Sequence, residues 1–269
     1  MLKPVPADHP LFSTAAYQKD NVSFSLMEVI RQQPLYLASD GRWAVVGMSS
    51  PHYPAWVWTD DAIPQSAVPA VIDCCSGLFD GQNRAQFVAK PAIAAALSAR
   101  FGGQKGAVAS TVQMQSFHCP QPVPPKNRDL PITQPVPGDE PQLADYLRNF
   151  DIDCFGELRH TGDLKQAAAR CIQSGRFYII RRPSGLIAAV AERKRDTDQF
   201  VAIGGVYTMP AYRGGGFAAA LVYHIAQNIL ADGKIPCLYT DLANPSSNRA
   251  YQNVGFAPCG RVDELTLTW

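Results

Sequence analysis

The sequence predicts an α/β protein, with a mixed α+β sheet in the C-terminal half and a smaller domain before it. A run rich in β-branched and aromatic residues, 199–209, ends at a glycine loop, and an amphipathic helix, 218–230, follows at once. The next apolar segment, 235–241, is predicted to be a strand parallel to the first, because a single helix connects the two. A proline-dense segment separates the two halves of the chain.

Composition sets the class of protein. The chain has 269 residues, of which 46% are hydrophobic and 17% charged, as expected for a globular protein with substantial cores. A net charge of +1 argues against a nucleic-acid partner. The absence of a long apolar run argues against a membrane span, and the N-terminus lacks an apolar signal core. We therefore expect a cytoplasmic protein.

The seven cysteines are odd in number and scattered, which is typical of reduced thiols in a cytosolic protein. Neither they nor the five histidines have the spacing of metal ligands, so no metal is expected.

Prolines are concentrated between residues 119 and 138, where they favour extended backbone. We therefore place an N-terminal α/β domain at residues 1–125, a proline-rich linker at 126–140 and a C-terminal domain at 141–269.

The N-terminal half begins with two apolar segments that are predicted to be paired strands. The elements predicted there are strands at 43–49 and 55–59, helices at 67–78 and 92–101, and a strand at 108–118.

The C-terminal half begins with two predicted helices, at 140–149 and 161–174. Strands at 176–181 and 185–193 then form a hairpin that turns at Pro183-Ser-Gly185. Gly204 and Gly205 interrupt the third strand and suggest a bulge. After the long helix and the strand at 235–241, we expect a short helix and two final strands.

The segment Tyr207-Thr-Met-Pro-Ala-Tyr-Arg-Gly-Gly-Gly-Phe-Ala218 carries the clearest functional signal. No Ser, Thr, Asp or Asn caps the helix that begins there, so its first N–H groups lack side-chain acceptors. Glycines can turn these groups toward one point, and the helix dipole favours an anion there. A flexible glycine turn is the alternative. The segment lacks the Gly-Lys-Ser/Thr ending of a P-loop.

A second motif, Asn244-Pro-Ser-Ser-Asn-Arg-Ala-Tyr251-Gln-Asn-Val-Gly255-Phe256, follows the strand at 235–241. Asn244 suits a helix N-cap, and Pro245 suits the first helical position, where its missing N–H has no cost. Gly255 suits the position after the helix.

The pattern Arg213-x-x-Gly216-x-Ala218, combined with the second motif, resembles the acyl-CoA-binding signature of the GNAT acetyltransferase superfamily. The resemblance covers about residues 141–269 and implies the GNAT fold in that half, with acetyl-CoA or another acyl-CoA as co-substrate. The succession of elements in the N-terminal half is similar, but the glycine loop is missing there. This arrangement looks like the two-halved glycine N-acyltransferase branch, with a degenerate GNAT-like N-terminal domain.

The resemblance also implies a set of site residues. The backbone of residues 206–208 would contact the pantetheine arm, and the amides of 214–218 would hold the diphosphate. Tyr251 would protonate the departing thiolate, although a packing tyrosine is the alternative. The implied cofactor-binding residues are Val206, Tyr207, Thr208, Arg213, Gly214, Gly215, Gly216, Phe217, Ala218, Asn244, Asn248 and Tyr251.

The catalytic base is less well marked, because the strand at 199–209 carries no carboxylate. Asp241, at the end of the next strand, is the first candidate, and a turn residue is its alternative role. Glu157 and Glu192 are further candidates.

The implied activity is that of an N-acetyltransferase, an acyltransferase that transfers groups other than aminoacyl groups. It would act on a primary amine of a small molecule or amino acid, as a monomer or homodimer. A protein or peptide N-acetyltransferase is one alternative. An acyl-CoA-binding sensor without turnover is another.

Overall fold

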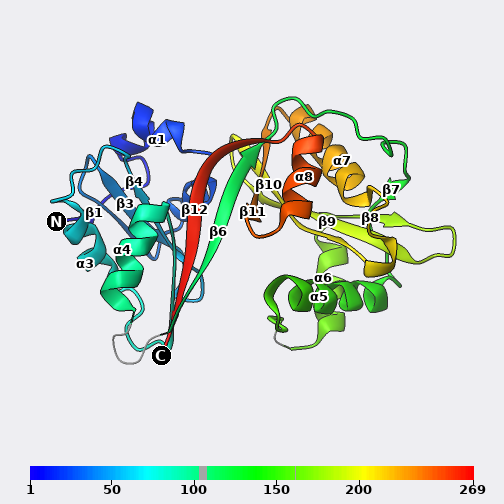
Figure 1. The fold of residues 1–269 in the computed structure, drawn as a ribbon, viewed down its shortest axis with the longest axis horizontal. Helices are drawn as coiled ribbons and strands as arrows, with labels where there is room; N and C mark the ends of the chain where they lie inside the picture. The colour runs from blue at the N-terminus through cyan, green and yellow to red at the C-terminus, as the bar shows by residue number, and fades with distance from the viewer. Residues whose placement is uncertain (103–107, 161) are drawn as a thin grey trace. The chain divides into compact units, whose positions relative to one another are not determined.

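The computed structural model describes residues 1–102, 108–160 and 162–269, and the chain forms two compact units (Figure 1). Unit 1 consists of Met1–Phe117, Tyr239–Asn244 and Pro258–Trp269, and unit 2 consists of His118–Leu238 and Pro245–Ala257. The division is not linear, because the C-terminal segment is part of unit 1.

Unit 1 is a sheet with helices on both faces. Its helices are η1 (Pro10–Ser13), α1 (Ala15–Lys19), α2 (Ser25–Ile30), α3 (Val68–Cys75) and α4 (Pro91–Phe101). Its strands are β1 (Lys3–Pro4), β2 (Tyr36–Ser39), β3 (Ala44–Met48), β4 (Ala55–Thr59), β5 (Arg84–Ala89), β6 (Val108–His118) and β12 (Ala257–Thr268), in the order β1-β2-β3-β4-β5-β12-β6. The pair β4–β5 is parallel, with α3 between them in the chain, whereas β12 is antiparallel to β5.

The core of unit 1 has two layers because consecutive residues of a strand point to opposite faces. Val46 packs in the cluster that contains Val71 of α3 and Leu97 of α4. Its neighbour Val45 packs in the other cluster, with Tyr17 of α1 and residues of α2. Strands buried on both faces are continuous apolar runs, which explains the sequence of β3 and β4.

Unit 2 repeats this plan. Its helices are α5 (Glu140–Phe155), α6 (Leu164–Gln173), η3 (Pro210–Tyr212), α7 (Phe217–Ala231) and α8 (Pro245–Asn253). Its strands are β7 (Ile132–Thr133), β8 (Phe177–Arg181), β9 (Ile187–Asp196), β10 (Phe200–Thr208) and β11 (Ile235–Asp241), in the order β11-β10-β9-β8-β7. The last residues of β11, from Tyr239, are part of unit 1. The pair β10–β11 is parallel, and α7 connects the two strands.

Helices cover the two faces of the unit 2 sheet (Figure 1). On one face α5 and α6 contribute Leu143, Leu147 and Ala168 to a cluster with Val190 and Tyr207 of the sheet. On the other face lies α7, whose spacing of apolar residues predicts one buried stripe. The stripe is buried as predicted, since Leu221, Val222, Ile225, Ala226 and Ile229 are fully buried.

Most predicted elements are confirmed, including the pairing of β3 with β4 and the hairpin of β8 and β9. The predicted helix at 140–149 continues to Phe155, where Gly156 ends it in a left-handed conformation. The helix predicted from Thr161 begins at Leu164, after the capping residue Asp163, and Thr161 itself lies outside the described residues.

The prediction of two final strands is wrong, because residues 257–268 form the single strand β12. Gly260 does not mark a turn within it. A Cβ at Gly260 would lie 2.2 Å from the hydroxyl oxygen of Ser23, so glycine permits close packing at this point of the strand. The pairing of β12 with β5 places residues 258–269 in unit 1, in contrast to the linear division at 126–140 predicted from the sequence.

Candidate functional site

The C-terminal end of β10 carries one side of the site. β10 pairs with β9 as far as Thr208, but its pairing with β11 ends at Ala202. Within the described residues, the backbone of Val206, Tyr207 and Thr208 therefore has an edge that β11 does not use. A register shift between Gly204 and Tyr207 confirms the predicted bulge, and Gly205 is left-handed with φ of +57°.

The glycine loop follows as predicted. Gly214 and Gly216 have φ of +78° and +73°, whereas Gly215 is not left-handed. α7 begins at Phe217, followed by Ala218, and no side chain caps its first turn. A Cβ at Gly214 would meet no atom within 4 Å. The space beside Gly214 is therefore open, and the uncapped first amides of α7 favour an anion.

Arg213 connects the loop to α5, a contact that the sequence did not predict. Its guanidinium donates to the carboxylate of Asp153 at 2.6 Å, and its Nε donates to the carbonyl of Thr208 at 3.2 Å. The hydroxyl of Tyr207 donates to the same carboxylate oxygen at 2.7 Å. In this conformation Arg213 anchors the loop to the ends of β10 and α5.

These contacts shift the titration of the groups involved. The hydrogen bond from Tyr207, together with Arg213, lowers the pKa of Asp153. Burial, helped by the carboxylate of Asp153, raises the pKa of Tyr207 to about 12. At neutral pH the arrangement is therefore a carboxylate that accepts from a neutral phenol and a guanidinium.

The proline-rich segment also contacts the glycine loop. The side-chain amide of Asn127 donates to the carbonyl of Gly215 at 2.5 Å, and a Cβ at Gly216 would lie 3.0 Å from that amide nitrogen. Further back, the amide of Val123 donates to the carbonyl of Val254, just after α8, at 2.7 Å. Residues near 123 and 127 therefore run along the ends of α8 and α7.

Tyr251 lies on α8 and is only 8% exposed. Burial raises the pKa of Tyr251 to about 12, and Cys154 of α5 is close enough to add to this effect. Asn248 precedes it by about one turn of the same helix, and Asn244 precedes the helix, on the segment that is part of unit 1. Tyr251 is thus a neutral phenol at physiological pH.

The three candidate bases have different surroundings. Asp241 is exposed, is part of unit 1, and accepts the N–H of Ala243 at 2.8 Å in a turn. Glu157 is exposed. Glu192 lies opposite Gly204 in the β9–β10 ladder, and its carboxylate would be 3.8 Å from a Cβ at Gly205. Of the three, Glu192 is the one at the bulge.

Among the residues that the structure describes, no helix is both long and apolar enough to cross a membrane. No group of three or more potential metal ligands occurs in the described ranges either.

Comparisons with known proteins identify the fold. Residues 179–262 match the family model described as FR47-like protein. A GCN5-related N-acetyltransferase from Sphaerobacter thermophilus superposes with a TM-score of 0.60 at 17% identity, over 99% of this chain and 94% of that one. The protein has the GNAT fold. None of the curated proteins searched matches the sequence.

Other GNAT structures match over the whole chain. An acetyltransferase of the GNAT family from Colwellia psychrerythraea has a TM-score of 0.52 at 12% identity, with 100% of both chains covered. A tandem GNAT protein from the clavulanic acid biosynthesis pathway has a TM-score of 0.50 at 13% identity, and covers 99% of this chain and 97% of that one.

The two units differ at the loop before the helix that connects their parallel strands. Before α7 this loop holds three glycines, whereas residues 60–67 before α3 contain none. They contain Asp60 and Asp61 instead, and Ala67 occupies the N-cap of α3 in a right-handed conformation. Of these two loops, only the one before α7 therefore carries the glycines.

Proposed function

We propose that the protein is an acyl-CoA-dependent N-acyltransferase that transfers an acyl group, with acetyl as the expected one, to a primary amine of a small molecule or amino acid. One observation carries the proposal. The left-handed glycines and uncapped start of α7 follow directly after the end of β10, whose edge is not paired with β11 beyond Ala202. A diphosphate and an extended amide-containing arm need these two features side by side.

The residues present fit coenzyme A. The amides of residues 214–218 would hold the diphosphate, because the space beside Gly214 is open and no side chain competes for the first turn of α7. The backbone of residues 206–208 would pair with the amides of the pantetheine arm, as an added strand pairs with a sheet edge.

When bound, an acyl-CoA supplies an activated thioester carbonyl. Tyr251 then contributes a proton held at its hydroxyl, because its pKa of about 12 keeps it neutral at the pH of the reaction. A thiol has an ordinary pKa of about 8.5, so a hydrogen bond from the phenol to the departing sulfur is favourable.

We assign the proton acceptor for the amine to Glu192 in preference to Asp241. The side chain of Glu192 is 21% exposed, and Lys194 lies 3.6 Å away. It adjoins the bulge, where the hydroxyl of Tyr146 donates to the carbonyl of Gly205 at 2.7 Å. The carboxylate of Glu192 therefore lies beside the bulge of β10 that precedes residues 206–208, whereas the carboxylate of Asp241 accepts a hydrogen bond within its own turn.

Cofactor binding is tested with Gly216→Val and the matched control Gly233→Val. Both glycines are left-handed, at +73° and +75°, and lie at opposite ends of α7. Both variants therefore introduce similar backbone strain, but only Gly216→Val places a side chain in the glycine loop, where its Cβ would also lie 3.0 Å from the amide nitrogen of Asn127. Calorimetric titration with CoA should show a Kd at least about tenfold higher for Gly216→Val, which equals the loss of one charge-assisted hydrogen bond of about 1.5 kcal/mol.

Equal CoA affinity in the two variants would contradict the assignment of the glycine loop. A wild-type protein that takes up no CoA at saturating concentration would contradict the whole proposal.

Turnover is tested by incubating the protein with acetyl-CoA and a panel of amines and amino acids while measuring the release of free thiol. Glu192→Gln should lower kcat/KM for thiol release by about 100-fold, the usual contribution of a general base, and Glu157→Gln should leave kcat/KM unchanged. An unaltered kcat/KM in Glu192→Gln would refute the assignment of this base. CoA binding without thiol release for any amine would favour a sensor, and release only with peptides would favour a peptide N-acetyltransferase.

A further inference from the structure

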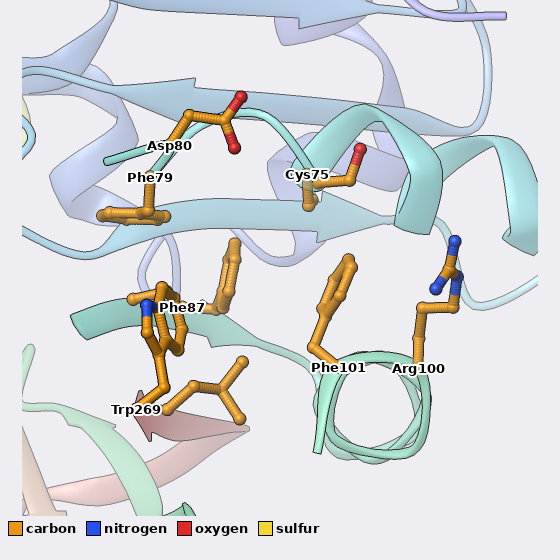
Figure 2. A pocket seen from close by; sticks show the side chains of 10 residues that line it. Cys75, Phe79, Asp80, Phe87, Arg100, Phe101 and Trp269 are labelled. Atoms are coloured by element: carbon orange, nitrogen blue, oxygen red, sulfur yellow. The ribbon is translucent and has the colours of Figure 1, made fainter. Parts of the chain in front are cut away.

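Unit 1 contains a cavity that is separate from the glycine loop and from Tyr251. It has a volume of about 160 Å³ and is partly open to solvent. It lies where α3 and α4 end, near the start of β5 and the end of β12, and Figure 2 shows its lining side chains. Every lining residue is part of unit 1.

Four aromatic side chains line the cavity: Phe79, Phe87, Phe101 and Trp269. Phe79 meets Phe87 edge to face with 5.3 Å between ring centroids, and Phe87 and Phe101 are near-parallel, with 16° between planes and 6.4 Å between centroids. Phe79 and Phe87 are buried in the core cluster, whereas Trp269 remains 45% exposed at the edge of the cavity. An apolar cavity of about 150 Å³ holds a benzene molecule in another protein, so this one has room for a single six-membered ring.

Charged groups stand at separate ends of the cavity. Figure 2 shows Arg100 of α4 beside Phe101, and Asp80 on the turn beyond Phe79 at the other end. The guanidinium of Arg100 lies 5.5 Å from the centroid of the Phe101 ring. Its ion pair with Asp73 is long, at 3.9 Å, and both side chains are about half exposed or more, so this pair competes weakly for the guanidinium.

We propose that this cavity binds a small aromatic monocarboxylate. The ring would lie beside Phe87 and Phe101, with Trp269 at the edge of the cavity, and the carboxylate would point toward Arg100. Apolar rings favour a flat apolar body through burial and edge or face contacts. The guanidinium supplies a planar pair of donors that matches a carboxylate, and Asp80 disfavours a second anionic group at the far end. The proposal does not depend on the acyltransferase activity.

The first test is a titration of the full chain with phenylacetate, in which tryptophan fluorescence is measured at each concentration. The chain has four tryptophans, and Trp269 is the one in the cavity. A saturable change in the fluorescence of the wild type that is absent in Trp269→Phe would place the ligand beside this ring. No saturable change in the wild type, or the same change in Trp269→Phe, would overturn the proposal.

The second test separates the charge from the ring. Phenylacetamide has the same ring without the charge and should bind about fivefold more weakly than phenylacetate, since a half-exposed ion pair contributes at most about 1 kcal/mol. Arg100→Gln should remove this difference by weakening phenylacetate alone. Because Arg100 is about half exposed, the variant should keep its fold, which circular dichroism will check. Calorimetry that gives equal affinities for acid and amide in the wild type would refute the proposed ligand class.

Discussion

The bulge in β10 makes Gly205→Ala a sharp test of how the site is built. Gly205 has φ of +57°, and a Cβ there would lie 2.7 Å from the hydroxyl of Tyr146. The left-handed conformation costs about 1–2 kcal/mol for a residue with a side chain. Tyr146 must also move, which breaks its hydrogen bond to the carbonyl of Gly205 and leaves buried groups unpaired, at a further cost of about 1–3 kcal/mol.

Gly156→Ala is the matched control, because Gly156 has φ of +75° and a Cβ there would meet no atom within 4 Å. Gly156 lies at the end of the helix that carries Tyr146, so its substitution by alanine introduces backbone strain without the clash. We therefore expect the free energy of unfolding to fall by about 2–5 kcal/mol in Gly205→Ala and by only about 1–2 kcal/mol in Gly156→Ala.

Urea unfolding followed by circular dichroism measures these differences. Tryptophan fluorescence is unsuitable, because all four tryptophans are in unit 1 and Gly205 is in unit 2. Adding Tyr146→Phe removes the clashing hydroxyl, so the double variant should be less destabilised than the sum of the two single variants by about 1 kcal/mol. A cost for Gly205→Ala equal to that of Gly156→Ala, or strict additivity with Tyr146→Phe, would refute the reasoning.

Three further predictions concern the same unit. Tyr251→Phe should lower kcat for thiol release by at least about tenfold while CoA affinity stays within a factor of about two, and equal loss of both would indicate a packing role instead. Asp153 has a lowered pKa in the folded state, so its stabilising contribution is present above its ordinary pKa of about 3.9 and is lost as the pH falls through the folded value. The difference in unfolding free energy between wild type and Asp153→Asn should therefore shrink on acidification below about pH 4. A constant difference would argue against the contacts of Asp153 with Tyr207 and Arg213. Gly255→Ala should lower the melting temperature more than Gly233→Ala. Both glycines are left-handed, but only a Cβ at Gly255 would meet a backbone atom, the carbonyl oxygen of Gln121, 2.8 Å away. Equal shifts in melting temperature would mean that the proline-rich segment does not pack against Gly255.

The elements that carry the site were predictable because their signals are local. The start of α7 is marked by the absence of a capping side chain and by three consecutive glycines, and its buried stripe by apolar residues at helical spacing. The bulge at Gly204 and Gly205 was likewise marked by glycine within a strand. Each signal lies within one element and its caps, so backbone conformation and periodicity suffice to predict it.

The partners of these elements were not predictable from such signals. Arg213 reaches Asp153 across 60 positions, Gly215 accepts from Asn127 across 88, and Gly205 accepts from Tyr146 across 59. Asp153 and Asn127 belong to no motif, and an isolated Asp or Asn on a helix or linker usually faces solvent. Their roles arise only when helix and loop ends are brought together by packing.

The sequence by itself determined the α/β class, the glycine loop and the helix behind it, because conformational preference and hydrophobic period act over a few residues. Only the tertiary structure decided that β12 pairs with β5, a strand about 180 residues away in the chain, and that Glu192 rather than Asp241 adjoins the bulge. Strand register and the surroundings of a carboxylate depend on which surfaces bury each other, and that free energy is summed over the whole folded chain.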